Sequence, residues 1–409
     1  MATPAFEKIA VTGVGVVSAA GVGAGRCFEA LCEGRDLLEE LPHDGCFGAP
    51  VQHFDPREWV PPRRLRRLNG LSRMAVVAAL EAVRETGLTP TPSTGAVIGT
   101  GLGALADTVS FIEQLLTDDP AQANPGLFPS TVMNVAASQI SMELGLTGFN
   151  TTVNHKEISG ELALLLAFDA LRLGRADGLL CGGVDELTRP VAHGYRRFDG
   201  LARGRPRPYR AGRDGLALGE GAAVLLLEPV EAARRRGAAV LAEVAAVASV
   251  GGVRPLLGWG PAEEQGRVVG PAVEAGVAAV AGAIAQAGLS PQDVDLVIGS
   301  GNGSRDLDRL EGEVLTRVFG GRAVPLTSPH GALGSWMAAG ALRLALGVEV
   351  LRRGEVFPTA TRGDPDPQVA VAGLHTPGRE PPPRPSVVLV CGHATGGGES
   401  AVVLVRERP

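Results

Sequence analysis

The sequence predicts an α/β fold that is built twice along one chain. Helical segments alternate with short apolar strands through the 409 residues, which is typical of mostly parallel sheets. Segment 87–103 runs from a helix end through a short turn and a buried strand to a glycine turn, and segment 288–303 repeats that order with matching residues. Segment 219–226 likewise resembles 398–404, since each is a turn that leads into an apolar strand. Matches in the same order along the chain indicate an internal duplication.

The elements of each half are expected in turn from the N-terminus. The first strand starts at Lys8 and enters a turn at Gly13, as a buried strand does. Later strands are expected near 151–156, 179–183, 323–328 and 387–391, and helices over 161–173 and 335–353. We place the boundary after an arginine-rich helix end, which divides the chain into an N-terminal half of residues 1–238 and a C-terminal half of residues 239–409.

Composition and charge exclude several classes of protein. The chain has 38 basic and 44 acidic residues and a formal net charge of −6, a balance that favours neither a nucleic-acid partner nor an anionic membrane. No apolar run approaches the ~18–20 residues that a membrane span needs. The five cysteines contain no CxxC pair, which indicates a reducing compartment. We therefore predict a cytoplasmic protein with no nucleic-acid or membrane partner.

The motifs for cofactors and metals are incomplete. The glycine turns at 13–15 and 99–103 each follow a strand, but neither completes GxGxxG with an acidic residue on the next strand. The chain also lacks the GxxxxGK[ST] motif. Four residues could in principle gather around zinc, but their spacing fits no usual pattern; they are Cys27, Cys32, His43 and Cys46. We predict no bound cofactor and no metal site.

Seven arginines fall between residues 196 and 213, interleaved with prolines and Tyr209. They form either a solvated loop with internal ion pairs or a docking surface for an acidic partner or a phosphate group. The sequence leaves both interpretations open.

The segment 151–161 has the form of a nucleophile elbow. A strand runs into a polar turn and then directly into a helix, a geometry that presents one side chain at the helix N-terminus. A nucleophile at that place should be Ser or Cys, but the chain has Glu157 there. A carboxylate at a helix N-terminus is favoured by ~0.3–1 kcal/mol, so Glu157 is also a credible structural choice. Glu157 would be a poor nucleophile toward a thioester, and as a general base it would need a partner.

Several stretches together resemble the β-ketoacyl-acyl carrier protein synthase family of the thiolase superfamily. The opening strand at 9–18, the turn at 182–186, and the segments at 207–209 and 213–222 are similar to the family's opening strand, its GG-x-(D/E) turn and its RPF…RDGFxxGEGA signature. The resemblance covers residues 7–405. It implies a thiolase-like fold of five αβαβα layers, a dimer, and acyl carrier protein as partner. It also implies no cofactor of its own, since phosphopantetheine arrives on the carrier protein.

The resemblance further implies that the chemical positions of the family have changed. Condensing members use one Cys to hold the acyl chain, and two His that promote decarboxylation and stabilise the enolate. Those three positions fall on Glu157, Ser300 and Gly331, with His330 one residue away. Because all three differ, we expect no competent catalytic residue and no condensation by this chain alone. Neither Cys181 nor Cys391 is a good substitute, because both fall in predicted core strands.

One branch of the family shares these losses, the chain length factors of type II polyketide synthases. The run 307–311 also resembles that branch, although its elbow usually carries Gln where this chain has Glu157. The resemblance implies a heterodimer with an active ketosynthase, with the strand near 150–155 at the dimer two-fold axis and an acyl tunnel between the subunits. Tunnel depth would be set by side chains on one helix, namely Thr108, Phe111, Ile112 and Leu115.

Two other functions stay open. The chain could be a malonyl-carrier protein decarboxylase that supplies the starter unit through Glu157, with His330 as its partner and Lys156 nearby. It could also be an acyl-binding or scaffold homodimer that needs no partner. Release of carbon dioxide from malonyl-carrier protein would identify the first alternative, and a folded protein without any partner would favour the second.

Overall fold

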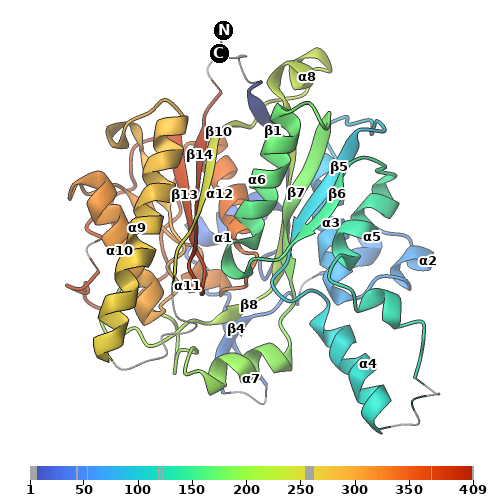
Figure 1. Ribbon diagram of the computed structural model, residues 1–409, viewed down its shortest axis with the longest axis horizontal. Helices are drawn as coiled ribbons and strands as arrows, with labels where there is room; N and C mark the ends of the chain where they lie inside the picture. The colour runs from blue at the N-terminus through green and yellow to red at the C-terminus, as the bar shows by residue number, and fades with distance from the viewer. Residues whose placement is uncertain are drawn as a thin grey trace.

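A sheet of 11 strands runs through the molecule (Figure 1). It combines two five-stranded units and one short additional strand, β2 (Gly21–Val22), which pairs with the first strand of the chain. The computed structural model describes residues 7–42, 45–52, 54–117, 120, 123–253, 262–369 and 371–407. The strands of the first unit are β1 (Ile9–Ser18), β5 (Thr94–Gly99), β6 (Asn150–Val153), β7 (Gly178–Asp185) and β9 (Gly221–Pro229). Those of the second are β10 (Ala242–Gly251), β11 (Leu296–Ile298), β12 (Leu326–Thr327), β13 (Val387–His393) and β14 (Gly398–Val405).

The two units have the same topology. The first has the strand order β6-β5-β7-β9-β1 and the second β12-β11-β13-β14-β10, which is one order repeated. Strand β9 of the first unit and strand β14 of the second are each antiparallel to both neighbouring strands. Strands β5 and β11 are each parallel to both neighbouring strands. Strands β1 and β10 pair antiparallel, with Ile9 opposite Val244, and so join the units. The predicted duplication is confirmed.

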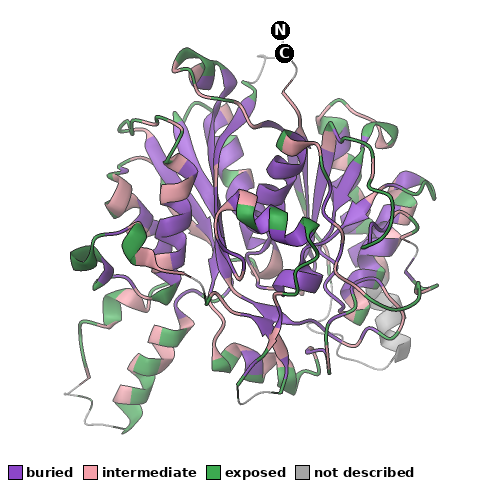
Figure 2. Cartoon of the chain, turned by 180° about the vertical axis from the view of Figure 1, so that it is seen from behind, coloured by how far each residue is buried: buried purple, intermediate pink, exposed green. Residues whose placement is uncertain are grey.

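Helices cover both faces of each five-stranded unit and give five layers. Helices α6 (Ser159–Arg172) and α12 (Gly340–Arg353) lie between the two units, while α3 (Gly70–Val83) and α5 (Val135–Leu144) cover the outer face of the first unit (Figure 1). Helices α9 (Ala262–Gln286) and α10 (Arg305–Phe319) cover the outer face of the second unit. Residues 340–351 of α12 are all buried, as Figure 2 shows for the centre of the molecule. The predicted thiolase-like αβαβα layering is therefore confirmed.

Shorter elements connect these layers. The strands are β2 (Gly21–Val22), β3 (Glu39–Glu40), β4 (Phe47–Ala49) and β8 (Leu218–Gly219). The helices are α1 (Ala24–Cys32), α2 (Pro62–Leu65), α4 (Leu105–Thr117), α7 (Arg189–Arg197), α8 (Val230–Arg235) and α11 (His330–Leu333). Single 3₁₀ turns are η1 (Pro56–Glu58), η3 (Phe128–Ser130), η4 (Lys156–Ile158) and η6 (Pro291–Asp293). The predicted helix 335–353 is wrong at its start, since α12 begins at Gly340, and the predicted half boundary at 238 falls between α8 and β10.

Small residues bring the layers close together. A side-chain carbon on Gly13 or Gly15 would lie 1.9 Å from a carbonyl oxygen of α3, so these glycines let β1 pack directly against that helix. Gly160 makes the same kind of approach, because a carbon there would lie 2.4 Å from the backbone nitrogen of Ala341 in α12. The predicted turn at Gly13 is wrong, because β1 continues to Ser18, and its glycines serve helix packing.

The structure places the cysteines mostly in the interior. Cys27, Cys46, Cys181 and Cys391 are buried thiols, and Cys32 is exposed. His43 of the weighed zinc set lies outside the described residues, and within the described ones no three His, Cys, Asp or Glu side chains converge as a metal site would require. Over the same part of the chain, no helix has the length and apolar character of a membrane span.

Candidate functional site

The elbow between β6 and α6 presents Glu157 at the start of a central helix. Lys156 has a φ of 50°, a left-handed conformation that is costly for a residue with a side chain and is concentrated at functional turns. The hydroxyl of Ser159 accepts from the His155 backbone N–H at 2.9 Å and donates to the Lys156 carbonyl at 2.7 Å. These bonds hold the turn, so the side chain of residue 157 is the one presented.

Three of the four predicted positions gather around one small pocket. Glu157, Ser300 and His330 all line a cavity of about 50 Å³ between the two halves of the fold. Its other lining residues are Tyr195, Leu216, Asn302, Ser304, Leu307, Ser335, Trp336, Arg343, His393 and Thr395. Gly331 lies outside this pocket, because its backbone packs on the carbonyl of Ala360, where a side-chain carbon would lie 1.8 Å away. Of the two neighbouring residues, His330 and not Gly331 therefore lines the pocket.

Thr395, from the C-terminal half of the chain, binds the Glu157 carboxylate. The backbone N–H of Thr395 donates to its Oε2 at 2.9 Å, and the Thr395 hydroxyl lies 2.9 Å from both carboxylate oxygens. Thr395 belongs to the turn between β13 and β14. Both Glu157 oxygens are thus occupied by one residue of the other half.

The described residues place no thiol in this pocket. Cys181 lies in β7 and Cys391 in β13, and both are fully buried. Burial raises the pKa of each thiol, which keeps it protonated and unreactive. The described residues therefore supply no thiolate at this site.

His330 is held neutral, with both ring nitrogens engaged. Nε2 accepts from Nη1 of Arg343 at 2.9 Å, so Nδ1 carries the proton and donates to the Gly334 carbonyl at 2.9 Å. Burial, and then the charge of Arg343, lower the pKa of His330 to about 3. Arg343 in turn forms a buried ion pair with Glu161 of α6. To exchange a proton with a substrate, His330 would have to release Arg343.

Ser300 sits on a second buried network. Its backbone N–H donates to Oε1 of Glu311 at 2.8 Å, and the Tyr209 hydroxyl donates to Oε2 of Glu311 at 2.6 Å. His393 contacts Glu399 through Nδ1, and its Nε2 lies 3.5 Å from Oε1 of Glu311. Burial opposes a charge on His393, but Glu399 and Glu311 outweigh it and raise its pKa to about 9. His393 is therefore a buried cation between two carboxylates.

The positive charge on His393 makes the free energy of unfolding fall as the pH becomes alkaline. Because the pKa of His393 is raised from 6.5 to about 9 in the folded state, its contribution is complete below about pH 6.5 and is lost as the pH rises through 9. We expect a loss on the order of 3 kcal/mol over that window, seen as a falling midpoint of urea denaturation. The His393→Gln variant should be less stable at pH 6 and show a flatter profile from pH 6.5 to 9; an equally steep profile would contradict this assignment.

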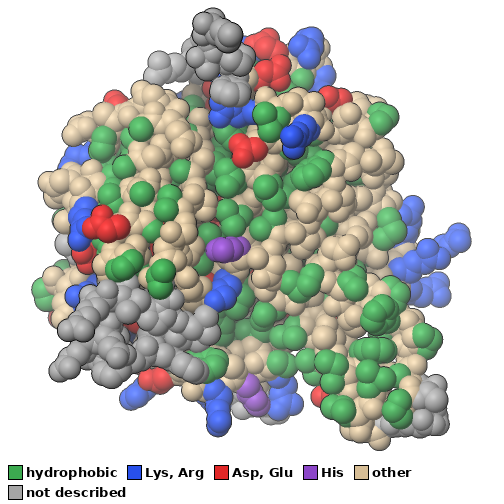
Figure 3. Space-filling model, viewed as in Figure 1, with side chains coloured by type: hydrophobic (Ala, Val, Ile, Leu, Met, Phe, Trp, Pro, Cys, Tyr) green, Lys and Arg blue, Asp and Glu red, His purple; other side chains and the backbone are tan. Residues whose placement is uncertain are grey.

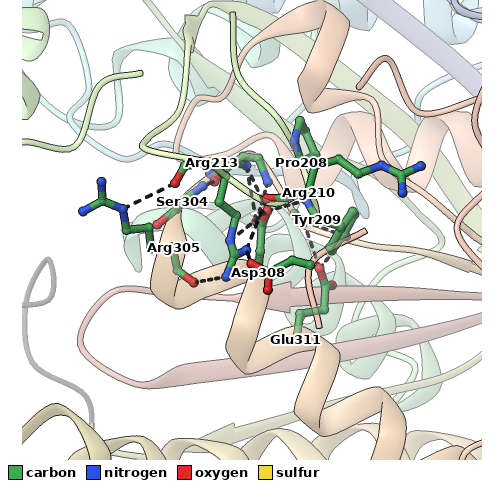
Figure 4. Close-up of polar contacts among 12 residues, drawn as sticks. Pro208, Tyr209, Arg210, Arg213, Ser304, Arg305, Asp308 and Glu311 are labelled. Atoms are coloured by element: carbon green, nitrogen blue, oxygen red, sulfur yellow. Dashed lines mark hydrogen bonds and ion pairs between the residues drawn. The ribbon is translucent and has the colours of Figure 1, made fainter. Parts of the chain in front are cut away.

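Residues of the arginine-rich segment anchor the site to α10 (Figure 4). The Tyr209 backbone N–H donates to Oδ2 of Asp308 at 2.7 Å, and Arg213 pairs with Asp308 at 3.9 Å and with Asp366. Burial raises the pKa of Asp308 to about 7. Arg205 also pairs internally, with Asp36. Two of the seven arginines, Arg205 and Arg213, thus form internal ion pairs. Tyr209 of the same segment fixes the turn that carries Ser300.

Comparison with known proteins identifies the family. The model of the beta-ketoacyl synthase N-terminal domain matches residues 6–233, and that of the C-terminal domain matches residues 260–362. The chain belongs to the beta-ketoacyl synthase family. Nodulation protein E of Rhizobium sp. (strain N33) is 32% identical to this ketosynthase-like chain over 378 residues, which cover 88% of the chain and 90% of the relative.

Other relatives come from polyketide synthases. The ketoacyl synthase alpha subunit of the tetracenomycin polyketide synthase from Streptomyces glaucescens is 29% identical, with 100% of this chain and 99% of the relative covered. The structure of the ishigamide ketosynthase/chain length factor superposes with a TM-score of 0.87 at 25% identity, covering 99% of this chain and all of that one. A ketosynthase in complex with its chain length factor from Xenorhabdus doucetiae shares the fold, with a TM-score of 0.81 and 19% identity, and covers both chains completely. This ketosynthase-like protein is thus similar to subunits of type II polyketide synthases.

The predicted tunnel residues lie on α4, away from the pocket. The Phe111 ring packs against that of Phe128 with centroids 6.0 Å apart, and Thr108 donates to the Ala104 carbonyl at 2.9 Å. Ile112 and Leu115 are exposed. None of the four lines the pocket of Glu157 or the smaller recess beside it, which Leu102 and Trp336 help to line. Their role as tunnel residues stays a prediction that concerns the assembled dimer.

Sequence reasoning missed several residues of the site. It weighed neither the Arg343–Glu161 pair, nor His393 as a pocket cation, nor Thr395 as the ligand of Glu157. Glu161 and Arg343 are charged residues in otherwise apolar helices, and this could have indicated an ion pair between them, because a buried charge needs a partner. Thr395 carried a weaker signal, as the one polar side chain in its glycine-rich turn.

Proposed function

We propose that this ketosynthase-like protein is the chain length factor of a type II polyketide synthase. It is a non-catalytic subunit that pairs with an active ketosynthase and shapes the tunnel in which the polyketide grows. The observation that carries the proposal is Glu157 at the elbow, bound on both oxygens by Thr395 where a condensing subunit needs a free thiolate. Its contribution to catalysis is shape and preorganisation. Like the active ketosynthase, it would work in the cytoplasm on chains that acyl carrier protein delivers.

An exposed apolar surface supports a protein partner. Figure 3 shows hydrophobic side chains gathered over α4, which projects from the body of the molecule. None of the described α4 residues is buried, and Leu116 is 80% exposed. Further exposed apolar side chains lie on or near α4, η3 and α5; they are Ile112, Leu115, Phe128, Val132, Met133 and Met142. A patch of this kind marks an interaction surface, and we assign it to the ketosynthase partner.

An open sheet edge adjoins that patch in the fold. Strand β6 pairs with β5 on one side and ends the strand order on the other. Its free edge offers backbone groups for pairing with a second subunit. We therefore place the dimer two-fold axis beside β6, as the similarity to the family implies.

The depth of the tunnel offers a test on α4. If Phe111 faces a tunnel that forms with the partner, Phe111→Ala should yield a polyketide longer by at least one extension unit, because a truncated wall leaves room for more chain. Product masses from the purified complex with carrier protein and malonyl donor would show it. Glu113→Ala, an exposed change on the same helix, is the matched control. An unchanged product with an intact complex would remove Phe111 from the tunnel.

The malonyl decarboxylase alternative has weaker support. Glu157 and His330 share the pocket, but Thr395 and Arg343 already occupy the groups that such a reaction would use. Carbon dioxide release from malonyl-carrier protein by the purified chain would favour this alternative. We expect none above the uncatalysed rate.

Co-expression with an active, cysteine-containing ketosynthase tests the main proposal, and a neighbouring gene that encodes one would be the first choice. We expect a one-to-one complex by native mass spectrometry and chain elongation that requires both subunits. Absence of a complex would contradict the proposal. A stable, folded homodimer of this chain alone would instead favour the acyl-binding or scaffold function.

A further inference from the structure

The turn between β13 and β14 lies directly on the elbow. A side-chain carbon on Gly398 would lie 2.6 Å from Nε2 of His155, and one on Gly396 would lie 3.2 Å from Nζ of Lys156. Directly before Gly396, Thr395 holds the carboxylate of Glu157. The turn and the elbow come from different halves of the chain, so their contact depends on the tertiary fold.

Backbone hydrogen bonds hold the ends of the turn, and Thr395 is its one side-chain anchor. The turn consists of Ala394, Thr395, Gly396 and Gly397, and both glycines have φ values near the left-handed region, at 100° and 98°. Glycines lower the conformational preference of a backbone, so such a turn needs an external anchor to hold one conformation. Its backbone bonds run from the Gly397 N–H to the Ala394 carbonyl at 3.0 Å and from the Ala394 N–H to the Gly398 carbonyl at 2.7 Å, and the Gly252 N–H donates to the Gly397 carbonyl at 2.5 Å. Thr395 is its one polar side chain, and that side chain is bound to Glu157.

The pocket behind this contact is small. Glu157 and Thr395 both line it, and at about 50 Å³ it has room for a few water molecules. An acyl chain of several carbons does not fit. Entry of an acyl group would therefore require the turn to move away from the elbow.

We infer that Glu157 is a positioning residue which latches the turn 394–397 over the pocket and closes that pocket to acyl chains. The latch is the set of hydrogen bonds from Thr395 to the Glu157 carboxylate. Glu157 at the elbow thus keeps the growing chain out of this pocket and leaves it to the partner's active site and the tunnel between the subunits. The inference rests on the proposed non-catalytic function, because a condensing subunit would need the same pocket open.

A thiol placed inside the pocket can report whether it is closed. Ser300→Cys puts a sulfur at a position that is 5% exposed and lines the pocket. The rate at which iodoacetamide alkylates Cys at that position, followed by peptide mass spectrometry on the full-length complex, measures opening of the turn. Native Cys32 is exposed and serves as the internal standard for folding and reagent.

We expect the latch variants to speed alkylation at position 300. In the Ser300→Cys background, Glu157→Ala removes every bond of the latch and should raise the rate at least about tenfold. Thr395→Val removes only the hydroxyl bonds and keeps the backbone N–H donor, so it should raise the rate by less, and the two changes together should match Glu157→Ala alone. Glu157→Gln keeps an acceptor for Thr395 and should stay within about threefold of the parent. Glu85→Ala removes an exposed carboxylate elsewhere and should change nothing.

The outcomes separate the latch from the proposed function. Unchanged alkylation in Glu157→Ala and Thr395→Val, with an intact complex, would overturn the latch and leave the chain length factor proposal standing. Faster alkylation in a chain that forms no complex with a ketosynthase would support the latch and contradict the proposed function. Additive effects of Glu157→Ala and Thr395→Val would also overturn the latch, because independent contacts would then hold the turn.

Discussion

Replacement of Arg343 by leucine will lower the free energy of unfolding by about 3–5 kcal/mol, because it leaves a buried carboxylate without its partner. The side chains of Arg343 and Glu161 are 3% and 0% exposed, and they join the two central helices. Arg343 also donates to Nε2 of His330, which would lose its donor. Urea denaturation of the parent and the variant at pH 7 measures the loss.

The control is the double replacement Arg343→Leu with Glu161→Leu. It removes both charges, so most of the lost stability should return if the unpaired carboxylate is the cause. Glu161→Leu alone should also be destabilising, since it leaves the Arg343 guanidinium buried. A loss under about 1 kcal/mol in the single variants would mean that water reaches the pair and that the central layer is less dry than the structure indicates.

In the complex, loss of the partner's active-site cysteine will abolish condensation, while loss of Glu157 will not. We expect a fall of at least about a thousandfold for a Cys→Ala change in the partner, since covalent capture of the chain depends on that thiolate. Glu157→Ala in this chain should leave elongation within about threefold, because the proposed function gives Glu157 no bond-forming step. Steady-state product formation with malonyl donor and carrier protein measures both.

The same pair of variants discriminates between the two functions. If Glu157→Ala stopped elongation in an intact complex and external acetyl starter restored it, Glu157 would supply starter units, and the decarboxylase would replace the chain length factor. Thr395→Val is the matched control, since it disturbs the Glu157 contact and keeps the carboxylate.

Much of the fold could be predicted from the sequence, because its signals are local. The repeated strand and glycine-turn segments at 97–103 and 297–303 predicted the duplication that the strand order confirms. The elbow was predictable for the same reason, since a strand, a polar turn and a helix follow one another within residues 151–161. Helix starts were less well predicted, because the chain before Gly340 contains residues that are compatible with a helix and yet forms α11 and a loop.

The candidate site shows where sequence reasoning stops. It proposed Glu157, Ser300 and the region of His330, and the structure brings these to one pocket. It aligned the second histidine position on Gly331, because one residue of register has no local signature between neighbouring glycines. The partners of Glu157 and His330, which are Thr395 and Arg343, lie far away in the chain and could not be inferred from spacing.

The sequence by itself thus determined the α/β class, the duplication, and the absence of a nucleophile at the elbow, since residue identity and local order suffice for each. Only the tertiary structure decided that Glu157 is bound by Thr395, that His330 is neutral beneath Arg343, and that His393 is a buried cation between Glu399 and Glu311. The physical reason is that these properties depend on burial and on charges brought together from both halves. Such contacts exist only once the two sheets have packed around their central helices.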